Sequence, residues 1–428
     1  MWIVGIVVLV LLVLSVPIGI ALSASAAAYL LTDPLLGPEV VFRAFFNFIN
    51  RYTLMAIPLF IYTGYLMEKT GLIAQLFRFA DALVGWMPGG FGIATVLACV
   101  LFAAISGSSV AMAAAMSVIA VPEMIKRGYP PWVAAGLVAT SGGIAILIPP
   151  SIPLILYGVV TETSVVRLFF AGVIPGLLLA AANIATIIAL AYYLKLPRGK
   201  FDAKVLLPAF IAALPGFGMP VVILGGLYGG LFTPTEAAAA ACGYAMLYGV
   251  LNSRRTEFMK ELLPTTMRAL SLTAVVLFLV GSVGVFQFLA ANLYWPQTIT
   301  KVMTSWGLTP MGFIWAFILV EMILGCFVDG VAMILLTVPV LFPVAMALKI
   351  DPVHLGILLT LTVEMSLVTP PVGLNLFAVS GVTKIPVSEV VKGSVPFFLT
   401  DALVLLAVVY FPGLATWLPD LLVVNVFK

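Results

Sequence analysis

Charged residues are so sparse in this chain, and so far apart, that most of it must lie in a membrane. No charged side chain precedes Asp33, and several later intervals also run without charge for roughly 20 residues or more, which is enough for a helix to span a bilayer. Of the 428 residues, 63% are apolar and 9% are charged, whereas a soluble domain usually carries about 25% charged residues. The sequence therefore predicts an all-α polytopic membrane protein.

The composition excludes several classes of function. A net charge of +3 provides no basic surface for nucleic acid. The three cysteines, Cys99, Cys242 and Cys326, lie in apolar stretches without CxxC spacing, which argues against a disulfide framework or a cysteine metal site. No GxxxxGK[ST] motif for ATP hydrolysis occurs. A single histidine, His354, excludes a histidine metal cluster, and an intramembrane serine hydrolase would have to use that residue.

The charge-free intervals also predict the order of the membrane segments. Full spans are expected at 2–31, 40–66, 132–159, 167–194, 206–226, 230–252, 264–291, 353–380 and 394–419. Two longer regions, 91–125 and 311–346, carry small or polar residues at their middle, so each is expected to form a re-entrant helical hairpin. Segments 69–84 and 295–308 are mixed in polarity and are expected to lie along the interface.

An internal repeat organises the chain. A shift of 221 residues aligns Pro149-Pro150 with Pro370-Pro371 and Ala111-Met112 with Ala332-Met333, together with further proline and glycine pairs. Inverted-topology repeats of this kind are typical of secondary transporters. In the first repeat, we expect scaffold helices and an interfacial arm at 1–90, followed by a hairpin, a broken helix and one further helix at 91–194. A cytoplasmic loop and a linking helix are expected at 195–226. In the second repeat, the scaffold and arm are expected at 227–309, and the hairpin, broken helix and last helix at 310–428.

Each repeat contains a helix that cannot stay regular across the bilayer. Thr140-Ser141-Gly142-Gly143 precedes one Pro-Pro pair and Ser366 to Thr369 precedes the other, and each proline removes a backbone donor. Carbonyls freed at membrane depth are tolerated where protein or a water-filled cavity satisfies them, and such carbonyls coordinate Na⁺ in transporters. A structural kink is the alternative, but two equivalent breaks with hydroxyls beside them favour ion sites.

The hairpin tips are the expected partners of these breaks. Ser106, Ser108 and Ser109 offer hydroxyl groups, and the helix N-terminus that follows them suits an anion. Asp329 stands where the second repeat would have Ser108, and we expect it to be a cation ligand or a gate. The alternative for the serines is close helix packing through small residues, and the alternative for the aspartate is a hairpin cap. In a proton-coupled carrier, Asp329 or Glu364 would titrate.

Other polar residues carry weaker signals. Thr233-Pro234-Thr235-Glu236 is typical of a helix start, which helix capping explains. Glu321 and Glu364 lie in apolar surroundings, but the sequence names no partner for either. His354 is expected to be an ordinary interfacial residue. A channel lined by the same broken helices is a further alternative, although duplicated hairpins argue against it.

Several motifs resemble those of a known transporter family. They are Ser106-Gly107-Ser108-Ser109-Val110-Ala111, Ile148-Pro149-Pro150-Ser151-Ile152-Pro153, Ala171-Gly172-Val173-Ile174-Pro175-Gly176, Thr233-Pro234-Thr235-Glu236-Ala237-Ala238 and Thr369-Pro370-Pro371-Val372-Gly373-Leu374-Asn375. Over its whole length the chain resembles the large membrane subunit of tripartite ATP-independent periplasmic (TRAP) transporters. The resemblance implies an elevator-type fold in the bacterial inner membrane, with two hairpins and two broken helices in a mobile domain.

The same resemblance implies Na⁺-driven import of a carboxylate solute, a small four-helix membrane subunit and a periplasmic substrate-binding protein. Carried over by position, the first Na⁺ site would involve Ser106, Ser108, Ser109, Gly142 and Gly143. The second Na⁺ site would involve Gly325, Asp329 and Thr369. The solute would contact Ser108, Pro150, Ser151, Pro371, Gly373 and Asn375. Overall likeness to large subunits of sialic-acid systems favours sialic acid as the solute, with C4-dicarboxylates as the alternative.

Overall fold

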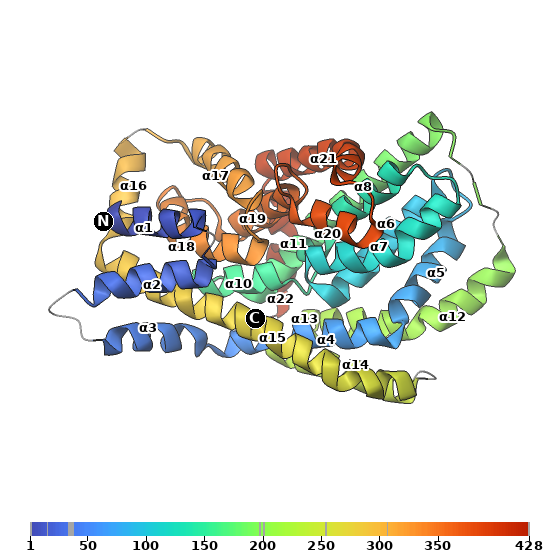
Figure 1. Cartoon of the computed structure of the whole chain (residues 1–428), viewed down its shortest axis with the longest axis horizontal. Coiled ribbons are helices and arrows are strands. Elements are labelled where there is room, and N and C mark those ends of the chain that lie inside the picture. The colour runs from blue at the N-terminus through green and yellow to red at the C-terminus, as the bar shows by residue number, and fades with distance from the viewer. Residues whose placement is uncertain are drawn as a thin grey trace.

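The computed structural model describes residues 2–14, 16–32, 38–196, 198–199, 202–252, 255–305 and 307–426. Within these ranges, the side chains of residues 2, 3, 9, 12, 13, 104–106, 296, 304 and 423–426 lie outside the description. Every regular element in the described part of the chain is helical (Figure 1). Six of these helices are long and apolar enough to cross a membrane, or up to eight if two bent pairs each count as one span. The all-α polytopic prediction is therefore confirmed.

The first part of the chain differs from the expected single helix over 2–31. Two shorter helices occupy this segment, α1 (Trp2–Val13) and α2 (Ile18–Leu30), and they pack against each other. Pro17 stands immediately before α2, and a proline inside an apolar run ends or kinks a helix because it lacks the backbone donor. The prediction of one continuous span here is wrong.

A bent helix and an amphipathic segment follow. The segment 39–70 is built from α3 (Glu39–Ile49), the short 3₁₀ turn η1 (Tyr52–Met55) and α4 (Ala56–Thr70), with a 64° bend between its two arms. The amphipathic helix α5 (Leu72–Val84) turns residues such as Leu76 and Phe77 inward, where it packs against α6 and α12.

The segments expected to form the first hairpin and the first broken helix are divided into several helices. The hairpin is α6 (Gly90–Ser106) and α7 (Ser109–Lys126). The broken helix comprises α8 (Pro131–Ser141), α9 (Ile144–Leu147) and α10 (Ile152–Thr161), and the long helix α11 (Val165–Tyr193) follows it. The link to the second repeat is α12 (Ala203–Pro220), continued through the π-helical η2 (Val221–Gly225) into α13 (Gly226–Tyr228).

The second part of the chain repeats this order. Its first helices are α14 (Pro234–Leu251), α15 (Arg255–Asn292) and α16 (Trp295–Ser305). Its hairpin is α17 (Pro310–Gly325) and α18 (Gly330–Ala347), and its broken helix is α19 (Pro352–Leu367) and α20 (Leu374–Thr383). The last helices are α21 (Val387–Tyr410) and α22 (Gly413–Val426). The two hairpins lie in opposite halves of the molecule (Figure 1).

The two repeats interlock rather than sit side by side. Helix α7 of the first hairpin packs on α20 of the second broken helix, and α18 packs on α10 in the equivalent way. Helices α8 and α21 cross at Gly136 and Gly393, where a side chain on either glycine would overlap the other helix's backbone. Small residues permit such close helix crossings in membrane proteins.

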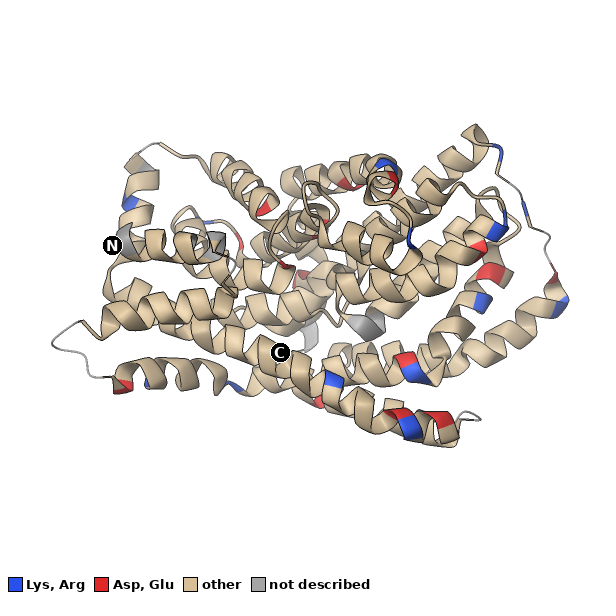
Figure 2. Cartoon of the chain, in the orientation of Figure 1, with Lys and Arg blue, Asp and Glu red and all other residues tan. Residues whose placement is uncertain are grey.

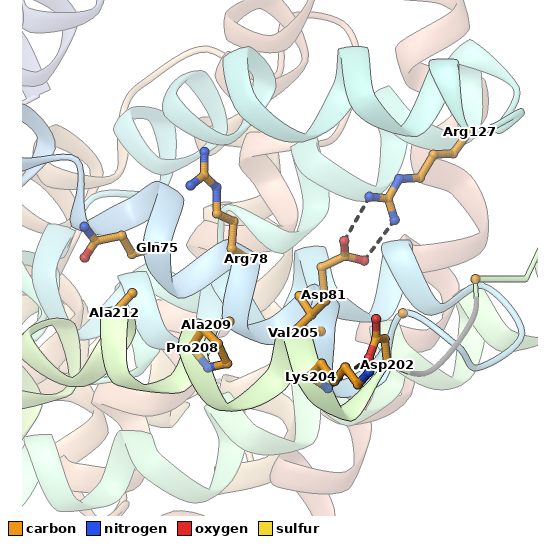
Figure 3. Close-up of a pocket in the computed structure, with 13 residues that line it drawn as sticks. Gln75, Arg78, Asp81, Arg127, Asp202, Lys204, Val205, Pro208, Ala209 and Ala212 are labelled. Atoms are coloured by element: carbon orange, nitrogen blue, oxygen red, sulfur yellow. Dashed lines mark hydrogen bonds and ion pairs between the residues drawn. The ribbon is translucent and has the colours of Figure 1, made fainter.

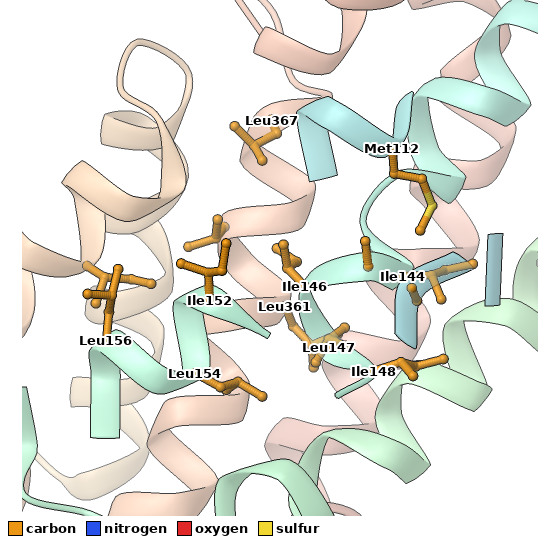
Figure 4. Close-up of a cluster of buried hydrophobic side chains, with 14 of the residues drawn as sticks. Met112, Ile144, Ile146, Leu147, Ile148, Ile152, Leu154, Leu156, Leu361 and Leu367 are labelled. Atoms are coloured by element: carbon orange, nitrogen blue, oxygen red, sulfur yellow. The ribbon is translucent and has the colours of Figure 1, made fainter. Parts of the chain in front are cut away.

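Apolar side chains hold the first broken helix in place. Ile146, Leu147 and Leu154 of the broken segment are buried, as are Met112 of α7 and Leu361 of α19 (Figure 4). Association of apolar helices in lipid depends on van der Waals packing rather than on transfer from water. The position of the broken helix is therefore determined by the close packing of these side chains, which come from both repeats.

Two local predictions have clear outcomes. Glu236 Oε2 accepts a hydrogen bond of 2.8 Å from the backbone N–H of Thr233, and the two residues form a complete capping box, so the predicted helix start is confirmed. His354, expected to be an ordinary interfacial residue, is covered by protein. It is buried in the first turn of α19, and its Nε2 lies 2.8 Å from the carbonyl oxygen of Val408.

Charge is unevenly placed along the molecule. Most Lys and Arg residues lie in the right-hand half of Figure 2, where the first hairpin and the start of α12 are found. Membrane proteins concentrate Lys and Arg in their cytoplasmic loops.

Candidate functional site

The turns of the two hairpins present polar groups at the start of a helix. The first turn consists of Gly107, which has a φ of +61°, and Ser108, the N-cap of α7. The second turn ends at Asp329, the N-cap of α18, whose Oδ1 accepts a 2.9 Å hydrogen bond from the backbone N–H of Val331. Asp329 therefore caps α18, and it is also exposed.

Both tips line one cavity of about 310 Å³. Its polar residues are Ser108, Ser109 and Asp329, and its apolar residues come largely from α4, α15 and the two broken helices. The N-termini of α7 and α18 open onto this cavity, and helix N-termini attract anions through their free N–H groups and dipole. An apolar pocket with a few convergent polar groups is the usual form of a small-solute site.

Behind the first tip lies a buried polar cluster. The Ser109 hydroxyl donates to Glu364 Oε2 at 3.2 Å and accepts from Asn375 Nδ2 at 2.7 Å. The same amide group of Asn375 also donates to the carbonyl oxygen of Ala139 at 3.1 Å. Gly143 lies so close to Glu364 that a side chain there would overlap the carboxyl group.

This cluster fits a sodium ion by the chemistry of its free atoms. Glu364 Oε1 and Asn375 Oδ1 are buried and have no hydrogen-bond partner among the described residues. Buried polar atoms without partners are rare in folded proteins. Hard cations take oxygen ligands of these types. The donor set is therefore suited to Na⁺.

The predicted second ion site is brought together only in part. Gly325 packs against Ser366 of the second broken helix, and the adjoining Cys326 carbonyl accepts a 3.3 Å hydrogen bond from the N–H of Gly373. The Thr369 hydroxyl donates to the carbonyl of Met365 at 2.6 Å. Asp329 lies instead on the side of the turn that faces the cavity with Ser108.

The residues predicted to contact the solute are dispersed. Ser108 lines the cavity, but Ser151 is buried, where its hydroxyl donates to the Ile146 carbonyl and accepts from the Leu154 N–H as the N-cap of α10. The remaining predicted residues are Asn375 behind Ser109, Pro150 beside Gly107, Gly373 beside Cys326, and Pro371 in an exposed position. The side chain of Ser106 lies outside the described residues.

Sequence reasoning missed the buried Asp401 and a partly exposed arginine, Arg51, at the end of α10. Asp401 of α21 is buried and interacts electrostatically with Glu364. A lone carboxylate within an apolar run usually has a function, and this pattern could have drawn attention to Asp401 in the sequence. Arg51 donates a 2.8 Å hydrogen bond to the carbonyl of Val159 in the last turns of α10 and pairs with Glu162 at 3.5 Å.

A second cavity, of about 750 Å³, lies at the base of the first hairpin (Figure 3). Arg127 makes two 2.9 Å hydrogen bonds to the carboxylate of Asp81 on α5, and it stacks over Phe91. Burial lowers the pKa of the Arg127 guanidinium, but Asp81 and Glu123 raise that pKa more, so the net direction is upward. This ion pair ties the hairpin base to α5.

The chain is similar to a known family of transporter proteins. The family described as "Tripartite ATP-independent periplasmic transporter, DctM component" matches residues 5–414. The chain is 38% identical to the C4-dicarboxylate TRAP transporter large permease protein DctM of Vibrio cholerae, over 97% of both chains. It is 36% identical to the sialic acid TRAP transporter large permease protein SiaM of the same organism, over 96% of both. The expected special likeness to sialic-acid systems is therefore not supported.

The fold has a counterpart among solved structures. The YdaH transporter of Alcanivorax borkumensis superposes with a TM-score of 0.63 at 12% sequence identity, over 91% of each chain. The curated relatives are named as transporter permeases and not as enzymes, which excludes the intramembrane hydrolase. The chain belongs to the large permease (DctM) family of the tripartite ATP-independent periplasmic transporters.

Proposed function

We propose that this chain is the membrane-spanning permease of a Na⁺-coupled importer of a carboxylate solute in the bacterial inner membrane. A small four-helix membrane subunit would pair with it, and a periplasmic binding protein would deliver the solute. The observation that carries the proposal is the single cavity at which both hairpin tips meet, with two helix N-termini directed to it.

The proposed transport cycle is of the elevator type. Helices α2, α3, α4, α14 and α15 pack together and would form the scaffold. The hairpins and broken helices would move as one body, because α7 packs on α20 and α10 on α18. Both groups line the cavity, because Ile61 of α4 and Leu272 of α15 line it together with the tips. A solute held there would change sides when one group slides past the other.

Two Na⁺ sites are proposed. The first would use Ser109, the neighbouring turn residues and the backbone at Gly142-Gly143, beside the unpartnered carboxylate oxygen of Glu364. The second would use the backbone at Gly325 with Thr369, near the Cys326–Gly373 hydrogen bond, and Asp329 would act at the cavity entrance. Sodium bound at these positions would hold each tip against a broken helix and so complete the solute site.

For the solute, we propose an organic acid, with C4-dicarboxylates first and sialic acid second. Relatives that transport C4-dicarboxylates match at 38% and 41% identity, and the sialic-acid relative at 36%. The cavity has no described Lys or Arg in its lining, so recognition of the carboxylate would depend on helix N-termini and hydroxyl groups.

The test is uptake into proteoliposomes that contain the chain with its small subunit, the binding protein outside and an inward Na⁺ gradient. Labelled succinate and labelled sialic acid are compared in parallel. Accumulation of one of them that needs both Na⁺ and the binding protein supports the proposal. Accumulation driven by a pH gradient in the absence of Na⁺ would mean proton coupling instead. Equilibration without accumulation, under any gradient, would indicate a channel.

A further inference from the structure

We propose that Glu364 and Asn375, from the second repeat, complete the first sodium site together with Ser109, so that one ion joins the two repeats. This inference rests on the proposed Na⁺ coupling and adds residues to it that the sequence assigned elsewhere or left without a role. Asn375 was expected at the solute, and Glu364 had no predicted partner.

The hydrogen-bond geometry leaves two acceptors for a cation. The Ser109 hydroxyl donates its only proton to Glu364 Oε2. The Asn375 amide donates its protons to Ser109 and to the Ala139 carbonyl. Glu364 Oε1 and Asn375 Oδ1 then remain, both buried and both without a donor among the described residues. Ser109 holds the two side chains to the same spot, so these oxygens belong to one cluster.

A buried carboxylate alone does not call for an ion, since Glu321 is buried in the same way. At Glu364, however, the Ser109 hydroxyl and the Asn375 amide add further oxygen ligands beside the charge. Glu364 is 1% exposed and Asp401 is 2% exposed, and none of the ion pairs among the described residues includes either carboxylate. A carboxylate buried without a compensating charge is strongly unfavourable. A sodium ion between Glu364, Asn375 and Ser109 would supply both the missing charge and the missing contacts.

The repeat explains why the site is asymmetric. Residue 143 is the equivalent of residue 364 at the offset of 221, and the glycine at this position leaves the space that the Glu364 carboxyl group fills. The first repeat thus contributes a hydroxyl and backbone, while the second contributes a carboxylate and an amide. An ion here would clamp the start of α7 to α19 and α20.

Such a clamp connects ion binding to the solute. Ser109 lines the cavity at the hairpin tips and also contacts the buried cluster. When the ion is bound, the Ser109 side chain and the first turn of α7 would be fixed, and the N-terminus of α7 would face the cavity in one orientation. Na⁺ would then be required before the solute binds tightly.

The experiment measures Na⁺ binding without transport. The thermal unfolding midpoint of the purified chain with its small subunit is titrated with NaCl, with choline chloride keeping the ionic strength constant, because a ligand that binds the folded state raises the midpoint. The variant is Glu364→Gln, which keeps the shape and removes the charge. The matched control is Glu321→Gln, because Glu321 is also fully buried with both carboxylate oxygens unpartnered among the described residues.

We expect the half-effective Na⁺ concentration to rise at least tenfold in Glu364→Gln and to stay within about twofold in the control. If the glutamine variant does not fold, Asn375→Leu serves in its place and should shift the titration in the same direction. A variant that responds to Na⁺ like the wild type would overturn the inference while leaving Na⁺ coupling intact. A wild type without any response to Na⁺, in unfolding and in uptake, would instead overturn the coupling itself.

Discussion

Gly143 and Glu364 occupy equivalent positions in the two repeats, 221 residues apart, and they lie directly against each other in the folded chain. One position carries no side chain and the other carries a carboxylate that fills the space. The contact lies where the first broken helix meets α19, next to Ser109 at the tip of the first hairpin. Equivalent positions of the repeat therefore hold unlike residues that fit against each other.

Replacing Gly143 by alanine should displace the Glu364 carboxyl group. The new methyl group would overlap that group, and overpacking of this kind costs about 1–3 kcal/mol. We expect a lower unfolding midpoint and loss of Na⁺-dependent uptake. Gly381→Ala is the control, because Gly381 lies within α20 with no heavy atom near its missing side chain. Equal behaviour of the two variants would refute the close contact.

Removing the Ser109 hydroxyl should weaken Na⁺ binding. Ser109→Ala loses a hydrogen bond to a charged group, worth about 1.5–3 kcal/mol, which corresponds to roughly a tenfold to hundredfold rise in the Na⁺ concentration for half-maximal uptake. Ser117→Ala is the matched control in the same helix, since the Ser117 hydroxyl only donates to the Ala113 carbonyl one turn earlier. Unchanged Na⁺ dependence in Ser109→Ala would remove this residue from the site.

The elevator motion can be tested across the cavity. Val276 of α15 and Val331 of α18 both line it, one on the proposed scaffold and one on the proposed mobile part. Cysteines at these positions, introduced after replacement of Cys99, Cys242 and Cys326, should crosslink to different extents with and without Na⁺. A matched pair within the scaffold should be insensitive to Na⁺. Identical crosslinking of the cavity pair under both conditions would contradict a sliding motion.

The Asp81–Arg127 ion pair should contribute modestly to stability. Its two hydrogen bonds are well formed, but both side chains are partly exposed, so solvent screening limits the pair to about 0.5–1 kcal/mol. A double-mutant cycle of Asp81→Asn and Arg127→Gln, followed by thermal unfolding, measures this coupling. A coupling energy near zero would mean that the pair does not hold the hairpin base to α5.

The helix breaks and the helix start at Thr233 could be predicted because they depend on local signals. Proline pairs interrupt helices wherever they occur, and the small residues at 106–109 mark a turn in an apolar run. The capping box at Thr233 is equally local. Pro17 gave the same kind of signal, which the expectation of one helix over 2–31 overlooked.

The contacts between repeats could not be predicted in this way. Asn375 and Ser109 are 266 residues apart and Glu364 and Ser109 are 255 apart, and the interlocking of α7 with α20 is what brings them together. His354 is buried for a similar reason, because the fold places the Val408 carbonyl beside it. Periodicity identifies a helix face but does not say which distant helix will cover it.

The most direct test of the account is the flux of the ion itself. Proteoliposomes with the chain, its small subunit and the binding protein are given ²²Na⁺ and a labelled organic acid together, and both labels are counted over the first seconds of uptake. We predict that ²²Na⁺ enters with the solute in a fixed ratio and that leaving out the binding protein abolishes both fluxes. Solute uptake at full rate with no accompanying ²²Na⁺ would contradict the account.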